Sequence, residues 1–589
     1  PAVGTLRKGE KQPLRATAVL SDGSRKDVTP IAQYRSLNPS VAEAAADGKV
    51  EARDCGEAVI IVTYLRFPAV ARVVVPQPQT QPFPETPVNN RIDDLVLAKL
   101  KALGMPPSEL CSDAEFLRRA HLDVIGLLPT PDGARAFLAD RDPKKRAKLI
   151  DRLLERDEFA DFCALKWGDL LRIKSEYPSN LWPNAVQAYY YWLRRGLVTN
   201  KPYDQFVREL LVSSGSNFRS PTANYYRALR KRDAQGYAEA TALVFMGARL
   251  ECARCHAHPT ENWTLDDNLG MAAFFAQVKI KTTREWKEEI VYVDPKQVLR
   301  HPVTKTAVAP KPLGGESAKL AESEDPRANF AAWLTSPENP WFARNIVNRV
   351  WYWLFGRGIV HEPDDMRPTN PPTNPELLAY LAQELVSHKC DLRHIYRLIL
   401  NSRTYQLSSK PNQWNANDVA HFSRYPVKRL AAEQLMDAIN QVTETFDKFT
   451  SQIPEPFTVL PDGFRATQLA DGSIGTAFLE LFGRPPRDTA YECDRSSDTS
   501  MQQALQLINA SDLTGKIARS PRLQRLLKDR KSDAEIADEL YLAALSRPPT
   551  AGEAQKVTAH LAKDEKARRQ AAEDLMWALL NTKEFLFNH

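Results

Sequence analysis

The spacing of apolar residues changes at about residue 90. Before that point, short apolar runs such as Ala16–Leu20 and Ala58–Tyr64 are separated by turn signals such as Ser21–Ser24, which is typical of β-strands joined by tight turns. After it, apolar residues recur at the spacing of amphipathic helices, for example over Ile92–Leu103 and Ala114–Ile125. We therefore predict a multidomain, mainly α protein in which two helical domains follow a small β-sandwich.

Two irregular segments separate these parts. A proline-rich stretch follows residue 76, where we expect a semi-rigid, extended linker. Later, the β-prone run Glu289–Val293 and the loose stretch Ala307–Lys319 interrupt the helical pattern. A chain of 589 residues is also too long for one core, since single domains rarely exceed about 300 residues. The predicted units are the β-sandwich at 1–76, the linker at 77–90, helical domains at 91–280 and 326–589, and an irregular linker at 281–325.

Composition narrows the class of protein. The chain is 43% hydrophobic and 26% charged, and it has no apolar run near the roughly 18 residues of a membrane helix, so we expect no transmembrane segment. The net charge of +6 is small, and basic clusters such as 144–146 and 230–232 are short, so we expect no nucleic-acid partner. The sequence begins at Pro1 inside the β pattern, and we expect this start to lie downstream of processing or truncation.

One short motif carries recognisable chemistry. Cys252, Cys255 and His256 form the pattern C-x-x-C-H. Two thiols at this spacing can add to the two vinyl groups of one haem, and the adjacent histidine can then bind the iron. The other five of the seven cysteines are scattered, so the chain is not a disulfide scaffold. We predict one covalent haem c with Cys252 and Cys255 as thioether anchors and His256 as proximal ligand.

Two other interpretations of the motif remain open. A structural zinc site needs four ligands, and His258 could join the two cysteines and His256, although two histidines two residues apart fit a compact zinc knuckle poorly. A redox dithiol of the thioredoxin type follows a strand and opens a helix, whereas this motif follows a predicted helix over Ala238–Leu250. If haem is present, His258 lies too close in sequence to reach the opposite face of the iron, and we expect it to tune the pocket or to pack.

The sequence also suggests which residues would surround the predicted haem. Trp263 and a predicted helix over Leu265–Val278, capped by Thr264 with Asp267 at capping-box spacing, would form a wall over one haem edge, with ordinary core packing as the alternative for Trp263. The distal ligand is unknown, and an open iron is equally compatible with the sequence. Five residues could supply that ligand, although single methionines and histidines usually lie in cores or on surfaces: Met246, Met271, Met366, His121 and His361.

Longer strings identify a family resemblance. Residues 14–44, "LRATAVLSDGSRKDVTPIAQYRSLNPSVAEA", with 56–75 resemble bacterial immunoglobulin-like modules. From about residue 90 to the end, the chain resembles the paired PSCyt and PSD domains of planctomycetes and verrucomicrobia, which are often fused to cytochrome c or immunoglobulin-like modules. The strings that carry this resemblance include "FLRRAHLDVIGLLPTPDGARAFLAD" (116–140), "CARCHAHPTENW" (252–263), "NPWFARNIVNRVWYWLFGRGIVHEPDDMRPTNPPTNPELL" (339–378) and "YECDRSSDTSMQQALQLIN" (491–509).

The resemblance implies an exported protein associated with polysaccharide breakdown and surface redox chemistry, but it assigns no mechanism. We predict an exported c-type haem protein, periplasmic or at the cell envelope, that relays electrons or oxidises a carbohydrate-related small molecule. Its partner would be a redox protein or an envelope complex. The alternative is a non-catalytic envelope scaffold in which the Cys/His motif is a structural metal site.

Two polar loops are candidates for a catalytic site. Residues 361–372 and 492–498 are rich in carboxylates and arginines, and could line a pocket at the haem edge where an arginine holds a substrate and a carboxylate accepts its proton. The alternative is that their charges pair with one another between domains. The candidate residues are Asp364, Asp365, Arg367, Glu492 and Arg495. No G-x-S-x-G, H-E-x-x-H or phosphate-loop motif is present.

Overall fold

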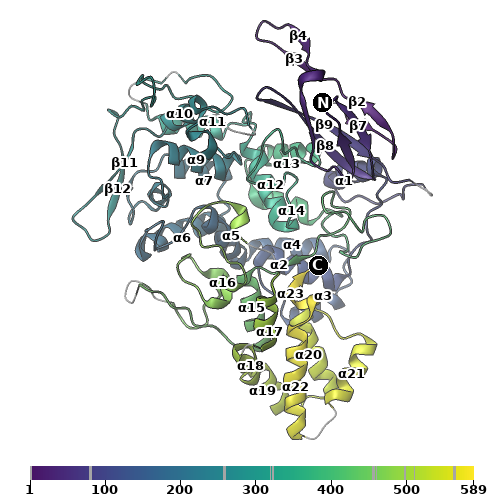
Figure 1. Cartoon of the computed structure of the whole chain (residues 1–589). Helices are drawn as coiled ribbons and strands as arrows, with labels where there is room; N and C mark the ends of the chain where they lie inside the picture. Colours follow the sequence, from purple (N-terminus) through teal and green to yellow (C-terminus); the bar gives the residue numbers. More distant parts are fainter. Residues whose placement is uncertain are drawn as a thin grey trace.

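A computed structural model gives the structure of residues 3–78, 82–256, 261–318, 320–321, 324–453, 458, 460–495, 499–509, 511–561 and 565–589. A small β-rich region, purple in Figure 1, precedes a large helical body that ends in a yellow-green group of helices. The predicted fold class, mainly α and multidomain with an N-terminal β region, is confirmed. Among the described residues no helix combines the length and the apolar character that crossing a membrane requires.

The N-terminal region contains two small sheets that share one core. One sheet has the order β1-β9-β8-β5, the other has the order β2-β7-β6, and β3 and β4 form a separate hairpin. Side chains of both sheets, including Val50, Ile60 and Val73, are buried together. The strands are β1 Val3–Thr5, β2 Lys11–Pro13, β3 Thr17–Val19, β4 Arg25–Asp27, β5 Gln33–Ser36, β6 Ala42–Ala44, β7 Lys49–Ala52, β8 Gly56–Tyr64 and β9 Phe67–Val75.

This β region is docked firmly on the helical body. The buried carboxylate of Glu57 on β8 accepts from Lys99 of α1 at 2.6 Å and pairs with Arg72 at 3.2 Å. Arg72 also donates to the carbonyl of Pro372. The Gln77 side chain, just beyond β9, donates to the carbonyl of Trp414 at 2.8 Å. The proline-rich segment therefore joins two parts that also contact each other directly.

The helices between residues 91 and 280 begin with strong local signals. Asn90 and Ser112 each form a capping box, which satisfies free backbone N–H groups at the start of α1 and α2. The elements are α1 Arg91–Leu103, α2 Asp113–Ile125, α3 Pro131–Ala139, α4 Lys145–Glu155, α5 Asp157–Leu170, α6 Pro183–Val198, α7 Tyr203–Leu211, β10 Gly215–Ser216, α8 Asn224–Arg227, α9 Ala234–Met246, α10 Leu265–Ala273, β11 Val278–Thr282 and β12 Glu289–Val293.

One predicted helix is too long. The helix expected over Leu265–Val278 ends at Ala273, and Val278 begins β11. Strand β11 pairs antiparallel with β12, so the β-prone run Glu289–Val293 recruits the preceding segment into a small sheet, with β10 at the far edge of β12. Tertiary pairing here overrides the helical pattern.

The remaining helices form the second half of the body. They are α11 Pro326–Leu334, α12 Phe342–Phe355, α13 Pro375–Ser387, α14 Leu392–Leu400, α15 Ala432–Thr443, α16 Ala477–Leu481, α17 Met501–Asn509, α18 Ser511–Ala518, α19 Pro521–Lys528, α20 Asp533–Leu545, α21 Ala551–Leu561, α22 Glu565–Leu580 and α23 Lys583–Leu586. A short pair of strands, β13 Lys428–Arg429 and β14 Phe587–Asn588, joins residues far apart in the sequence.

The hydrophobic cores do not divide at 281–325. One core extends through helices α1 to α14, because α7 packs on α11 and α9 packs on α12. A second core lies among α15 to α23, and it includes Leu122 and Leu128 from the first half. Arg327 of α11, almost fully buried, donates to the carbonyl of Ser213 at 2.7 Å. The two halves are therefore interlocked by packing and by buried polar contacts.

Residues 585–589 complete the surroundings of α2. The buried guanidinium of Arg118 donates to the carbonyl of Phe585 at 2.7 Å. The buried guanidinium of Arg119 donates to the carbonyl of His589 at 3.1 Å. A buried arginine without such acceptors would be costly, so this segment is an integral part of the fold around α2.

Candidate functional site

The C-x-x-C-H motif lies on an exposed turn. Helix α9 ends at Met246, its C-cap Gly247 has a left-handed backbone (φ 67°), and a short 3₁₀ helix, η3, then spans Glu251–Arg254. Cys252 lies within η3, and Cys255 is the residue at which η3 ends. Both cysteine thiols are free and exposed, and His256 is also exposed to solvent, whereas Ala253 is buried.

This arrangement fits the covalent haem predicted from the sequence. Both thiols are exposed to solvent, and the residue after Cys255 is the exposed histidine. No strand–helix unit of the thioredoxin type surrounds the cysteines in the described residues. His258 lies outside the described residues, so the structure gives no position for this candidate.

Trp263 connects the motif region to the helical core. Its ring is partly buried and lies 6.4 Å from the ring of Trp341, which in turn lies 6.1 Å from Trp333. The capping box predicted at Thr264 and Asp267 is present at the start of α10. The aromatic rings therefore lead from the segment after the motif towards α11 and α12.

The five candidate distal ligands occupy different environments. Met246 and Met271 are fully buried core residues. His121 is buried, and its Nδ1 lies 2.9 Å from the carbonyl of Leu117. His361 is half-buried, and burial lowers its pKa to about 4. Met366 is also half-buried, and its backbone N–H donates to the carbonyl of Gly247 at 2.8 Å, so it contacts the segment that leads into the motif.

The two polar loops meet each other next to this segment. Asp364 is fully buried and accepts from Arg249 at 2.6 Å and from the backbone N–H of Glu492 at 3.1 Å. The Glu492 carboxylate pairs with Arg349 at 2.6 Å. Arg249 lies three residues before Cys252. The structure thus brings Asp364 and Glu492 together beside the motif.

The other loop residues are also paired. Arg367 lies 3.2 Å from Asp365. Arg495 bonds to the carboxylates of Glu433 on α15 and Asp169 on α5, both at 2.7 Å. Asp364, Glu492 and Arg495 thus form ion pairs with residues outside the two loops, and Arg367 pairs with Asp365 within its own loop.

Glu261 was missed by sequence reasoning. It follows the motif closely and is only 7% exposed, and its Oε1 has no hydrogen-bond partner among the described residues. Burial raises its pKa to about 7, Arg367 opposes this increase and Asp365 adds to it. A single glutamate between polar neighbours carries no sequence signal, because its protonation depends on the loop that covers it.

Glu261 is expected to destabilise the fold at high pH. A carboxyl with a pKa above its unfolded value of 4.5 disfavours folding once the unfolded chain ionises, and the penalty grows as the pH rises from about 4.5 to 7. We expect Glu261→Gln to stabilise the protein at pH 8 by on the order of 1–3 kcal/mol and to have almost no effect at pH 4. Thermal unfolding at both pH values measures this. The exposed Glu285→Gln variant is the control, and an equal effect of Glu261→Gln at both pH values would contradict the expectation.

A cavity of about 490 Å³ adjoins the motif. One wall is a stripe of α9 formed by Gly236, Glu239, Ala240 and Leu243. The other walls are formed by residues 229–231, 249–251 and 488–491 together with Arg172, Tyr177 and Pro178. The Tyr491 hydroxyl lies 3.4 Å from the carboxylate of Glu251, the residue before Cys252. Sequence reasoning could not find this cavity, because its walls come from segments more than 200 residues apart.

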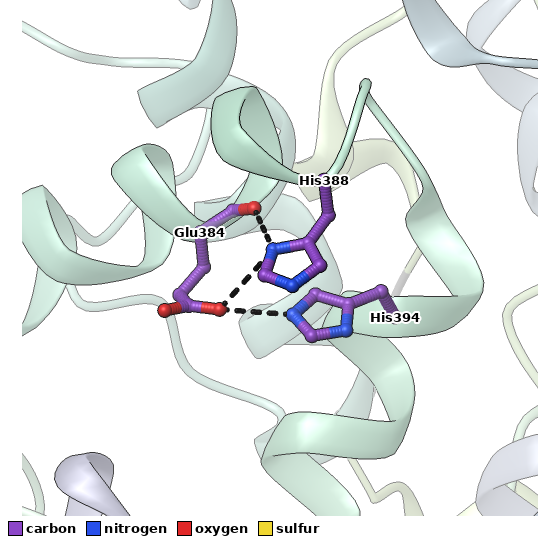
Figure 2. Close-up of side chains that lie close together, drawn as sticks. All are labelled: Glu384, His388 and His394. Atoms are coloured by element: carbon purple, nitrogen blue, oxygen red, sulfur yellow. Dashed lines mark hydrogen bonds and ion pairs between the residues drawn. The ribbon is translucent and has the colours of Figure 1, made fainter.

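A second cluster of potential ligands lies at the end of α13. Glu384, His388 and His394 place one donor atom each within 4.8 Å of one another, and Figure 2 shows both imidazoles facing the carboxylate. The imidazole rings are stacked at 3.6 Å with an angle of 13°, so their in-plane lone pairs do not converge on one point. His388 Nδ1 also lies 2.9 Å from a backbone carbonyl, where it donates. We interpret this cluster as a polar link between α13 and α14.

Together, the fold and the site define a helical, two-part protein with an N-terminal β region and an exposed C-x-x-C-H turn. Residues 91–280 match the family model PSCyt2, described as a protein of unknown function (DUF1549), and residues 326–561 match PSD1, described as a protein of unknown function (DUF1553). The chain belongs to the family that carries these paired domains. A comparison with curated proteins gave no match.

Proposed function

We propose that this protein is an exported c-type haem protein that acts in redox chemistry, as an electron carrier or as an oxidase of a carbohydrate-related small molecule. The observation that supports this best is the exposed turn that carries Cys252, Cys255 and His256 within five residues, with both thiols free. When bound, a haem would supply an iron that takes up and releases single electrons.

The protein holds this turn in a fixed position. Arg254, inside the motif, pairs with Asp233 at 2.6 Å and with Glu239 at 3.2 Å, which ties the turn to the start and the middle of α9. Ala253 is buried below the turn. Two thioethers on a rigid turn would fix the orientation of the cofactor, and His256 would bind the iron from the same side.

Location and partners follow from the proposed cofactor. The thioether bonds of c-type cytochromes are made on the outer side of the cytoplasmic membrane, so the protein would be periplasmic or attached to the cell envelope. A redox protein or an envelope complex would exchange electrons with it.

Covalent haem is the direct test. In a host that makes c-type cytochromes, we expect in-gel haem staining and a pyridine haemochrome spectrum for the wild type, and complete loss of both for Cys252→Ser/Cys255→Ser. Cys55→Ser removes a free thiol of the β region and should retain the haem. His256→Ala should keep covalent attachment but change the visible spectrum, because the proximal ligand is lost. Unmodified Cys252 and Cys255 in the native host would contradict the proposal.

A non-catalytic envelope scaffold is the second candidate. It is favoured by the rigid docking of the β region and by the complete pairing of Asp364, Glu492 and Arg495 between helices. In this case the Cys/His motif would be a structural metal site. Metal analysis of the purified protein distinguishes the two, since the scaffold predicts bound zinc that depends on Cys252 and Cys255 and no haem.

A further inference from the structure

The cavity beside the motif contains a buried cation without a counterion. Arg172, just after α5, is 8% exposed, and its Nη1 has no hydrogen-bond partner in the described part of the chain. No carboxylate there forms an ion pair with it. Burial lowers the pKa of this guanidinium, and Asp494, the carboxylate whose charge opposes this decrease, is not within ion-pair distance of it. Buried charges are normally paired, because an unpaired one is strongly destabilising.

The other charged groups of the wall are already satisfied or exposed. Lys231 pairs with Glu251 at 2.5 Å, and Arg249 pairs with Asp364 at 2.6 Å. Arg230 is exposed to solvent. Of the carboxylates, Glu239 pairs with Arg254, and Asp488 pairs with Lys174 at 2.8 Å. Arg172 is therefore the buried cation of this wall whose charge has no partner in the described residues.

The remaining lining suits a small organic molecule. The volume of about 490 Å³ lies within the usual range of about 300–1,000 Å³ for ligand sites. The wall combines apolar side chains, such as Ala240 and Leu243, with the aromatic rings of Tyr177 and Tyr491. A few polar groups within an apolar and aromatic lining are typical of such sites.

We propose that this cavity binds a small molecule that carries an oxyanion, a carboxylate or a sulfate, with Arg172 as its counterion. The guanidinium presents several N–H donors in a plane and matches the two oxygens of such a group. The site is distinct from the arginines of the two polar loops, which have protein partners. The proposal goes beyond the redox role and does not depend on it, because Arg172 and the α9 stripe lie outside the motif.

The test uses the full chain and defined probes. We expect sodium sulfate or sodium glucuronate, at constant ionic strength set with sodium chloride, to raise the unfolding temperature of the wild type by about 2 °C or more. Glucose should give no increase. A response to glucuronate alone would indicate an acidic sugar, and a response to both would indicate recognition of the oxyanion itself. The anions should raise the unfolding temperature of the Cys252→Ser/Cys255→Ser variant by the same amount. The anion site can therefore be tested even if the haem proposal fails.

Two substitutions test separately the charge of Arg172 and the space of the cavity. Arg172→Met removes the buried charge and should abolish the anion-dependent increase without lowering the unfolding temperature of the free protein, since the lost charge was unpaired. Ala240→Leu fills the cavity and should weaken binding at least tenfold with Arg172 intact. Arg141→Gln, an exposed arginine away from the cavity, is the control. The proposal would be overturned if the anions did not raise the unfolding temperature of the wild type. It would also be overturned if they raised the unfolding temperature of Arg172→Met and Ala240→Leu as much as that of the wild type.

Discussion

Replacing Asp123 by alanine is expected to destabilise the protein by about 3–5 kcal/mol. Asp123 on α2 is buried, and its carboxylate accepts from Tyr405 at 2.8 Å, from Tyr425 at 2.7 Å and from Asn588 at 2.8 Å. It also pairs with Lys428 at 2.7 Å. Alanine removes the only counterion that Lys428 has among the described residues and the carboxylate that accepts from Tyr405, Tyr425 and Asn588, although Lys428 and Tyr425 keep the carbonyl of Leu354 as an acceptor. An uncompensated charge and lost buried hydrogen bonds together are costly.

Chemical denaturation followed by circular dichroism measures this loss. The control is Asp529→Ala, an exposed aspartate at the end of α19, which should change stability by less than about 0.5 kcal/mol. Adding Lys428→Met to Asp123→Ala removes the orphaned charge and should recover part of the loss. If Asp123→Ala costs no more than Asp529→Ala, the carboxylate does not hold this network together.

Replacing Glu433 by glutamine is expected to have a similar effect, with a characteristic pH dependence. The Glu433 carboxylate is fully buried on α15 and bonds to Arg495 at 2.7 and 3.1 Å, with Arg484 at 3.4 Å. Despite burial, these arginines hold its pKa at about 2, below the ordinary value of 4.5. Glutamine removes the charge, which takes from Arg484 its carboxylate partner and leaves Arg495 with Asp169 alone, so we expect a loss of about 3–5 kcal/mol at pH 7.

The sign of the pH effect follows from the lowered pKa. The stabilisation by ionised Glu433 is fully present above the unfolded pKa of 4.5 and is lost as the pH falls towards 2. The difference between wild type and Glu433→Gln should therefore shrink by roughly half between pH 7 and pH 3. Denaturation curves at both pH values measure it, with the exposed Glu480→Gln as control. A difference that does not depend on pH would show that the charge of Glu433 is not the cause.

The sequence predicted the elements better than their assembly. Helices α1 and α2 appear where the spacing of apolar residues places them, and the structure adds capping boxes at Asn90 and Ser112 that define where they begin. The helix expected to continue to Val278 ends early, since β12 competes for that segment. The sharing of one core by α1 to α14 had no sequence signal, because it depends on contacts between residues far apart.

The candidate site was predictable only where its residues are adjacent in sequence. Cys252, Cys255 and His256 form a recognisable string, and the structure adds that they lie exposed on a 3₁₀ turn. The sequence left open whether the two polar loops line a common pocket or pair their charges, and the structure shows that Asp364 accepts from the backbone N–H of Glu492 and from Arg249. The unpaired charge of Arg172 could not be predicted, because a missing partner becomes visible only after every neighbour has been placed.

The contacts of residues 585–589 with α2 affect how the chain can be made. Arg118 and Arg119 lie near the start of the helical body, yet the carbonyls of Phe585 and His589 that they bind lie 467 and 470 residues further along the chain. Domains of long chains commonly fold one after another as they emerge from the ribosome. The region around α2 departs from that order, because its two buried guanidiniums lack these acceptors until residues 585–589 have been made.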